Sequence, residues 1–113
     1  MKWTLDSLER ALRKALASSS KLKLGELPPN LAADVTWGSS PAKIRVDGHK
    51  VGIRPAVIHE LLHVVLDEDL KPFDAQIQEV IIEALEKTVD ARVSNSKRRI
   101  RWWRNSIKTK TTK

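Results

Sequence analysis

VIHELLHVVL, the stretch from Val57 to Leu66, says more about the fold and chemistry of this chain than any other segment. On a helix of 100° per residue with His59 at 0°, its apolar side chains fill the arc from about 140° to 340°. The polar side chains of His59, Glu60 and His63 share the remaining window, at about 0°, 100° and 40°. A helix that is apolar nearly all round is a buried one. Each polar group in the window therefore needs a partner in the fold.

The spacing of the two histidines is that of a metal site. Residues four apart on a helix share a face, so the imidazoles of His59 and His63 can converge on one zinc ion. Glu60 is offset from that axis and can reach a water bound to the ion, which is the H-E-x-x-H arrangement of zinc hydrolases. Glu60 would take the proton of this water as it attacks a carbonyl. The competing interpretation is a chance match in which the three side chains pack against other polar groups.

The segments on either side of this helix predict a small α+β domain. The predicted elements are an amphipathic helix at 5–17, a short strand at 34–37, a hairpin at 43–53, a helix at 55–67 and a helix at 73–93. The hairpin rests on an Asp-Gly turn between alternating apolar residues, and a single strand followed by a loop is the alternative. The order helix, strands, helix, helix is typical of an α+β domain.

A catalytic zinc site needs a third protein ligand and an open position for water. His49 is the third histidine, and the helix at 73–93 carries several carboxylates. That helix is the simpler source, because a short connection makes the two helices antiparallel neighbours. Its apolar face is expected at Ile77, Ile81, Ala84, Leu85 and Thr88. The acidic residues lie on the opposite face, and we interpret Glu86 and Asp90 as solvated.

HELLH, followed by a helix carrying QEVIIEALEKTV, resembles the gluzincins and most of all the minimal soluble gluzincins, or minigluzincins. The resemblance covers roughly residues 35–90 and implies a minimal zincin-like domain, with a two- or three-stranded sheet ahead of the HExxH helix. Thermolysin-like enzymes carry N-E-x-x-S-D on the later helix, which maps onto residues 78–83. The resemblance thus implies Glu79 as the zinc ligand and Glu83 as the partner of His59. The interval from His63 is one helical turn shorter than in thermolysin, so Glu79 and Glu83 could exchange roles.

Further parts of a peptidase site can be assigned only by residue type. His49, Arg45 and Arg54 are candidates to hold the oxyanion or to contact substrate. The segment 43–47 or 50–54 is expected to be the edge strand that pairs with an extended peptide.

The positive charge of the chain is concentrated at its C-terminal end. The formal net charge is +7, yet residues 1–93 carry 13 Lys and Arg against 14 Asp and Glu. Residues 94–113 carry eight Lys and Arg and no acid. We therefore divide the chain into a metallopeptidase domain at 1–93 and a basic tail at 94–113.

The tail allows four interpretations. It could bind nucleic acid, lie on an anionic membrane surface, cap the core with its tryptophans, or cover the active-site cleft and keep the enzyme latent. The residues concerned are Arg98, Arg99, Arg101, Trp102, Trp103 and Arg104.

Composition limits the remaining choices. The chain of 113 residues is one small domain without cysteine, so a metal site must use His, Asp or Glu. No apolar run reaches the roughly 20 residues that span a bilayer, and the first residues are unlike a signal peptide, so we expect a cytoplasmic protein. The leading hypothesis is zinc-dependent peptide-bond hydrolysis, with one Zn²⁺ per chain on His59, His63 and Glu79 and with Glu60 as general base. The alternative is an inactive zincin-like binding module whose tail engages nucleic acid.

Overall fold

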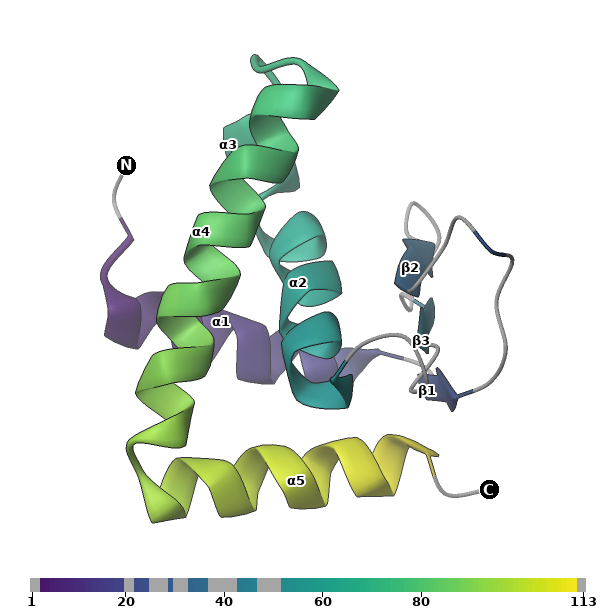
Figure 1. Ribbon diagram of the computed structural model, residues 1–113, viewed down its shortest axis with the longest axis vertical. Helices are drawn as coiled ribbons and strands as arrows, with labels where there is room; N and C mark the ends of the chain where they lie inside the picture. The colour runs from purple at the N-terminus through teal and green to yellow at the C-terminus, as the bar shows by residue number, and fades with distance from the viewer. Residues whose placement is uncertain are drawn as a thin grey trace.

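The computed structural model describes residues 3–19, 22–24, 29, 33–36, 43–46 and 52–111. In these ranges the chain forms helices that surround one central helix, with short strands along one side (Figure 1). The elements are α1 (Leu5–Ser18), β1 (Leu22–Leu24), β2 (Ala33–Thr36), β3 (Lys43–Val46), α2 (Ile53–Val65), α3 (Asp67–Leu70), α4 (Ala75–Ser94) and α5 (Lys97–Thr111). No helix in these ranges is both long and apolar enough to cross a membrane.

The predicted α+β class is wrong, because the protein is a mostly helical small domain. The four longer helices have 14, 13, 20 and 15 residues, whereas each strand has only three or four. The strands lie in the order β1-β3-β2, with β3 parallel to β1 and antiparallel to β2. At Ile44 the register places Leu22 on one side and Val35 on the other. The sheet therefore consists of short strands at the edge of a helical core and does not make the domain α+β.

The hairpin predicted at 43–53 is also wrong. β3 ends at Val46 and takes β2 as its antiparallel partner, while Ile53 already belongs to α2. Residues 47–51, which include the Asp-Gly pair, lie outside the described residues. The alternation that suggested a second strand up to residue 53 ends in the first turn of a helix, where Pro55 fits without losing a hydrogen bond.

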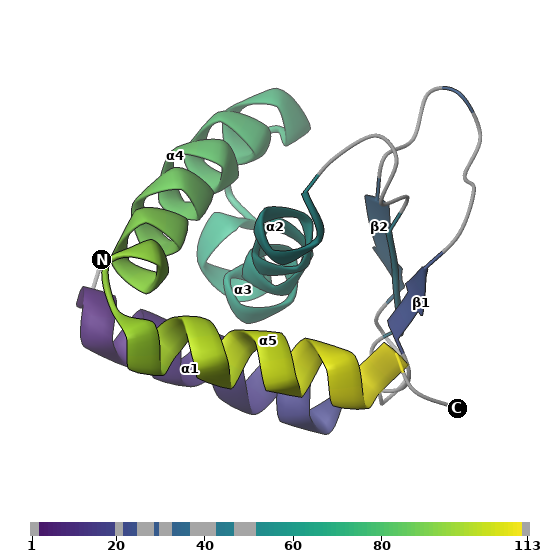
Figure 2. The same ribbon diagram turned by 60° about the horizontal axis from the view of Figure 1, so that its bottom comes forward.

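α2 is the central element, as its nearly continuous apolar surface predicts. It contacts α1 and α4 and lies against β2 and β3, and Figure 2 shows it enclosed by these elements and by α5. Ile58, Leu61 and Leu62 are fully buried. Burial of each such side chain contributes about 1.5–3 kcal/mol, so α2 holds the domain together.

α4 turns a different face to the core from the one predicted. Its buried residues are Ile82, Val89 and Val93, whereas Ile77 is 45% exposed. Ile81 and Leu85 of the predicted face are half-buried and pack against the core. The buried face of α4 is therefore rotated from the predicted one toward Ile82 and Val89. As a result, the acidic residues beside the true core face lie along α2.

The stretch set apart as a tail forms α5, and α5 completes the core. Trp103 is fully buried and Ile107 is 9% exposed. α5 lies beside α1 and runs in the same direction (Figure 2). Near the start of α1, Trp103 Nε1 lies 3.4 Å from Glu9. At its end, Lys110 Nζ donates hydrogen bonds to the carbonyl oxygens of Ala17 and Ser19. Of the four interpretations of this stretch, the one in which a tryptophan packs into the core describes Trp103.

Candidate metal centre

α2 and α4 are joined by a row of cross-helix pairs. Each helix contributes one polar residue to a pair every turn or two along the face that the two helices share. The paired residues follow each other in opposite order along α2 and α4, so the two helices are antiparallel. The pairs are Arg54 Nε with Asp90 Oδ1 at 2.7 Å, His59 Nδ1 with Glu86 Oε1 at 2.8 Å, and His63 Nε2 with Glu79 Oε1 at 2.7 Å.

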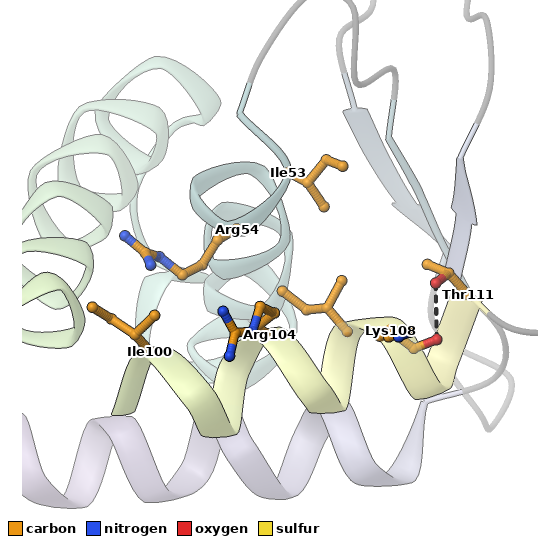
Figure 3. Close-up of a pocket in the computed structure, with 7 residues that line it drawn as sticks. Ile53, Arg54, Ile100, Arg104, Lys108 and Thr111 are labelled. Atoms are coloured by element: carbon orange, nitrogen blue, oxygen red, sulfur yellow. Dashed lines mark hydrogen bonds between the residues drawn. The ribbon is translucent and has the colours of Figure 1, made fainter. Parts of the chain in front are cut away.

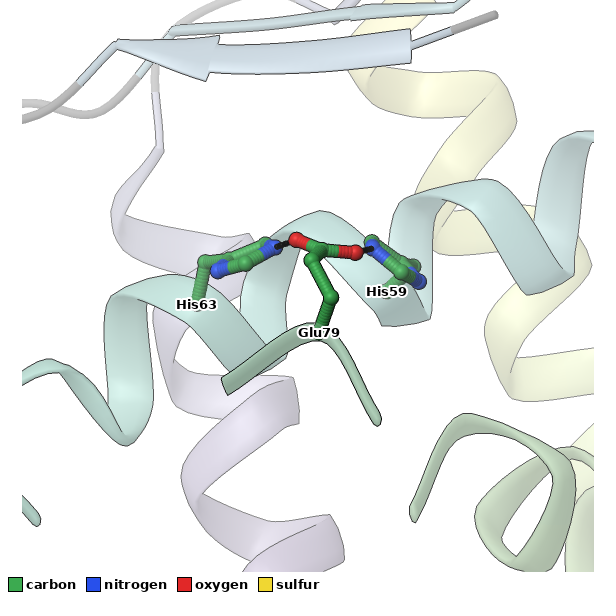
Figure 4. A group of neighbouring side chains, drawn as sticks. All are labelled: His59, His63 and Glu79. Carbon is green, nitrogen blue, oxygen red and sulfur yellow. Dashed lines mark ion pairs between the residues drawn. The ribbon is translucent and has the colours of Figure 1, made fainter. Parts of the chain in front are cut away.

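Three of these side chains converge on one point. The second carboxylate oxygen of Glu79 lies 3.2 Å from Nε2 of His59, so the carboxylate bridges the two imidazoles (Figure 4). One ligand atom from each of His59, His63 and Glu79 lies within 4.8 Å of the others. Tetrahedral zinc with bonds of about 2.1 Å holds its ligand atoms about 3.4 Å apart. Small side-chain rotations would therefore bring these atoms into position around one ion.

His59 is held through both ring nitrogens. Its Nε2 faces Glu79, while its Nδ1 lies against Glu86. A neutral His59 that donates Nδ1–H to Glu86 presents the lone pair of Nε2 toward His63 and Glu79, which is how ligating histidines are usually oriented. A divalent ion at this point would be bound by that lone pair of Nε2 and by the Glu79 carboxylate that Nε2 faces.

The partner of His59 is Glu86, not the predicted Glu83. Glu86 lies seven residues, or about two turns, after Glu79, so both face α2. Glu83 is rotated toward solvent and is exposed. The interpretation of Glu86 and Asp90 as solvated is wrong as well, since their side chains are 23% and 24% exposed and each is paired with α2. The i, i+7 spacing from Glu79 was the signal in the sequence that could have identified Glu86.

Burial and charge set the protonation of the site. Burial lowers the pKa of His63 below its ordinary value, and the adjacent Glu79 only partly offsets this. The neutral form is the one that ligates a metal. The imidazoles of His59 and His63 are each 18% exposed, and the Glu79 side chain is 47% exposed, so an ion could enter from solvent. Glu60, which follows His59 on α2, is 8% exposed.

The other predicted site residues are not gathered at this centre. His49 lies outside the described residues. Arg54 donates to Asp90 and to the hydroxyl of Ser94, which hold it on α4. Arg45 is an exposed residue of β3. β3 is the middle strand of the three, so it is not the edge strand expected at 43–47, and residues 53 and 54 of the alternative segment are helical.

The basic residues of α5 fall into two groups. Arg99 donates to Glu9 and so belongs to the core network. Trp102 packs edge-on against Trp103 and lies under the Arg13 guanidinium, 4.5 Å from the ring centroid. The exposed cations of its outer face are Lys97, Arg98, Arg101, Arg104 and Lys108. The buried Trp103 therefore lies on another side of α5 from these exposed cations.

Comparisons with protein-family models, with curated proteins and with solved structures found no match to this chain. The assignment of the centre therefore depends on its own geometry.

Proposed function

We propose that this protein is a zinc-dependent peptidase whose centre is formed by His59, His63 and Glu79. The observation that carries the proposal is the convergence of two Nε2 atoms from α2 with a carboxylate from α4. The Glu86 carboxylate on Nδ1 of His59 supports it, because ligating histidines commonly have such a partner. A site with two imidazoles, one carboxylate and a fourth position open to solvent is typical of catalytic rather than structural zinc.

The residues have separate roles in the proposed reaction. Bound zinc would supply Lewis acidity and a water of lowered pKa. Glu60, which follows His59 on α2 and is 8% exposed, would act as general base and then as proton donor. Glu86 fixes the tautomer and ring orientation of His59. The edge of β2 that is not paired with β3 is the strand edge nearest α2 that could receive an extended peptide.

Metal content per chain tests the centre independently of activity. Protein purified without added metal is expected to contain about one zinc per chain, as the three-ligand set allows. His63→Ala is expected to lose it. Glu83→Gln, an exposed change on the same helix, is the matched control and is expected to keep it. Equal zinc content in the His63→Ala protein would refute the centre.

Glu60→Gln tests the chemistry once the metal is established. The variant is expected to bind zinc as the unmodified protein does and to lose hydrolysis of unstructured protein substrates by about 10²–10⁴-fold, the usual contribution of a general base. Circular dichroism and zinc content serve as the fold control, because Glu60 is buried. Undiminished hydrolysis by a folded, zinc-loaded Glu60→Gln protein would contradict the mechanism.

The cationic outer face of α5 favours a second candidate function, binding of nucleic acid through phosphate contacts. Stacking of bases on Trp103 is not part of it, because that ring is buried. Affinity for duplex and single-stranded oligonucleotides is expected to fall steeply with salt. Arg98→Glu with Arg101→Glu is expected to remove it. Undetectable binding at low salt would eliminate this candidate.

α5 does not cover the centre in the described part of the chain. It packs on α1 and reaches α2 at Ile53 and Arg54, the end remote from His63. This packing does not support the hypothesis that residues 97–111 keep the enzyme latent.

A further inference from the structure

A cavity of about 390 Å³ opens between the first turn of α2 and one side of α5, from Ile100 to Thr111 (Figure 3). Its wall is formed by three isoleucines, three cations and Thr111. The isoleucines are Ile53, Ile100 and Ile107, and the cations are Arg54, Arg104 and Lys108.

The isoleucines make the cavity a place for hydrocarbon. Ile53 comes from α2 and Ile100 and Ile107 from α5, so the apolar wall is formed where two helices separate. Ile107 is only 9% exposed, which fixes the inner wall to the core. Apolar surface of this kind contributes about 25 cal/mol for each Å² that a ligand removes from water. Small-molecule sites usually begin at about 300 Å³, so this volume is sufficient for one small ligand.

The three cations make the wall of the cavity positively charged. Arg104 and Lys108 are four residues apart on α5 and so lie on the same face, which also lines the cavity. Asp90 compensates Arg54. Arg104 has no ion pair or hydrogen bond among the described residues. A single anionic group at the mouth could therefore accept hydrogen bonds from Arg104 and Lys108 without displacing any partner of Arg104.

We propose that this cavity binds a small amphipathic anion, a carboxylate on a linear hydrocarbon chain. Its carboxylate would meet Arg104 and Lys108, and its chain would lie along the three isoleucines. At about 30 Å³ for each water-sized group, the volume corresponds to about 13 non-hydrogen atoms, close to a chain of about ten carbons. A phosphate group is a poorer match than a carboxylate, because one of the three cations is not available to it: Arg54 already donates to Asp90.

This site is separate from the candidate metal centre, and it shares only Arg104 and Lys108 with the cationic face of α5. It involves the N-terminal end of α2, whereas His59 and His63 lie further along the helix. It also requires the hydrocarbon wall, which a phosphate backbone would not use. Arg101, on the same helix as Arg104 and equally exposed, does not line the cavity and so provides a matched control.

Isothermal titration of the full chain with decanoate, kept below its micelle concentration, tests the proposal. One saturable site is expected, with affinity lowered about tenfold or more in Arg104→Ala, since a hydrogen bond to a charged group has about that effect. Lys108→Ala is expected to weaken it similarly, and Arg101→Ala is expected to leave it unchanged. Decanol, which lacks the charge, and acetate, which lacks the chain, are each expected to bind at least about tenfold more weakly than decanoate.

Several results would overturn the proposal. They are no saturation at about 1 mM decanoate, equal binding of decanol, or equal weakening by Arg101→Ala and Arg104→Ala. Binding only to vesicles of anionic phospholipid, and not to free decanoate, would assign the cations to a membrane surface. Urea unfolding of each variant distinguishes loss of the ligand site from loss of the fold.

Discussion

Replacing Glu9 with glutamine is the most informative single change in the fold, because one carboxylate connects three helices. Glu9 is 4% exposed on α1 and accepts hydrogen bonds from Arg13, from Arg92 of α4 and from Arg99 of α5, at 2.9–3.0 Å. Glutamine keeps the shape but removes the charge, and it turns an amide N–H toward guanidinium groups that are themselves donors. Removing one partner of a buried ionic group costs about 3–5 kcal/mol. That is a large part of the about 5–15 kcal/mol of a typical domain.

Urea unfolding followed by tryptophan fluorescence measures this loss. With a slope of about 2 kcal/mol per M, a loss of about 4 kcal/mol lowers the midpoint by about 2 M. Glu68→Gln, the same substitution at an exposed position of α3, is the control and is expected to change stability by less than about 0.5 kcal/mol. Equal midpoints for the two variants would refute the view that Glu9 ties α5 to α1.

The same carboxylate gives the stability a defined pH dependence. Burial alone raises the pKa of Glu9, but hydrogen bonds from Arg92, Arg13 and Arg99 outweigh it and leave the pKa below its ordinary value. The folded protein therefore binds the proton less readily than the unfolded chain. This contribution to stability is complete above the unfolded pKa, near 4.5, and is lost as pH falls toward the folded pKa. Glu9→Gln is expected to flatten the acid limb of the stability profile.

Three further outcomes concern the metal centre and the core. Glu86→Gln is expected to weaken zinc binding about 10- to 100-fold by a chelator competition assay, because it removes the anion on His59, whereas Glu83→Gln is expected to change it little. Zinc affinity is expected to fall as pH drops through the lowered pKa of His63 and to be steady above it, since only the neutral imidazole binds zinc. Metal titration at several pH values measures this, and a midpoint of the affinity loss above pH 6.5 would contradict it. Trp103→Ala is expected to cost about 3–5 kcal/mol in urea unfolding, and a cost below about 1 kcal/mol would show that α5 is not part of the core.

The sequence predicted the part of the candidate site that depends on helix periodicity, which is the pair of histidines. The i, i+4 spacing of His59 and His63 places them on one face regardless of the rest of the fold, and a short connection makes the next helix their neighbour. Glu79 followed from the resemblance to gluzincins, and the structure brings it to both imidazoles. Glu86 was missed because an acidic residue on an apparently outward face is normally solvated.

The fold was harder to predict from the sequence, because it depends on contacts between residues that are far apart in the chain. α4 has two apolar sides, and only packing against α2 determines which one is buried. The spacing of Ile100, Trp103 and Ile107 indicates an amphipathic helix in the basic stretch, but nothing local shows that Arg99 neutralises a carboxylate on α1. The strands are so short that their alternation resembles the turn and helix that follow them.

The pairing of the first helix with the last has a kinetic consequence. Trp103 and Glu9 are 94 residues apart, and Lys110 and Ala17 are 93 apart. Contacts between such remote residues form late, because closing so long a loop costs entropy before any contact compensates for it. During synthesis, α1 leaves the ribosome with a carboxylate whose partners on α4 and α5 have yet to be translated. Docking of α5 on α1, and with it the burial of Trp103, is therefore expected to be among the last steps of folding.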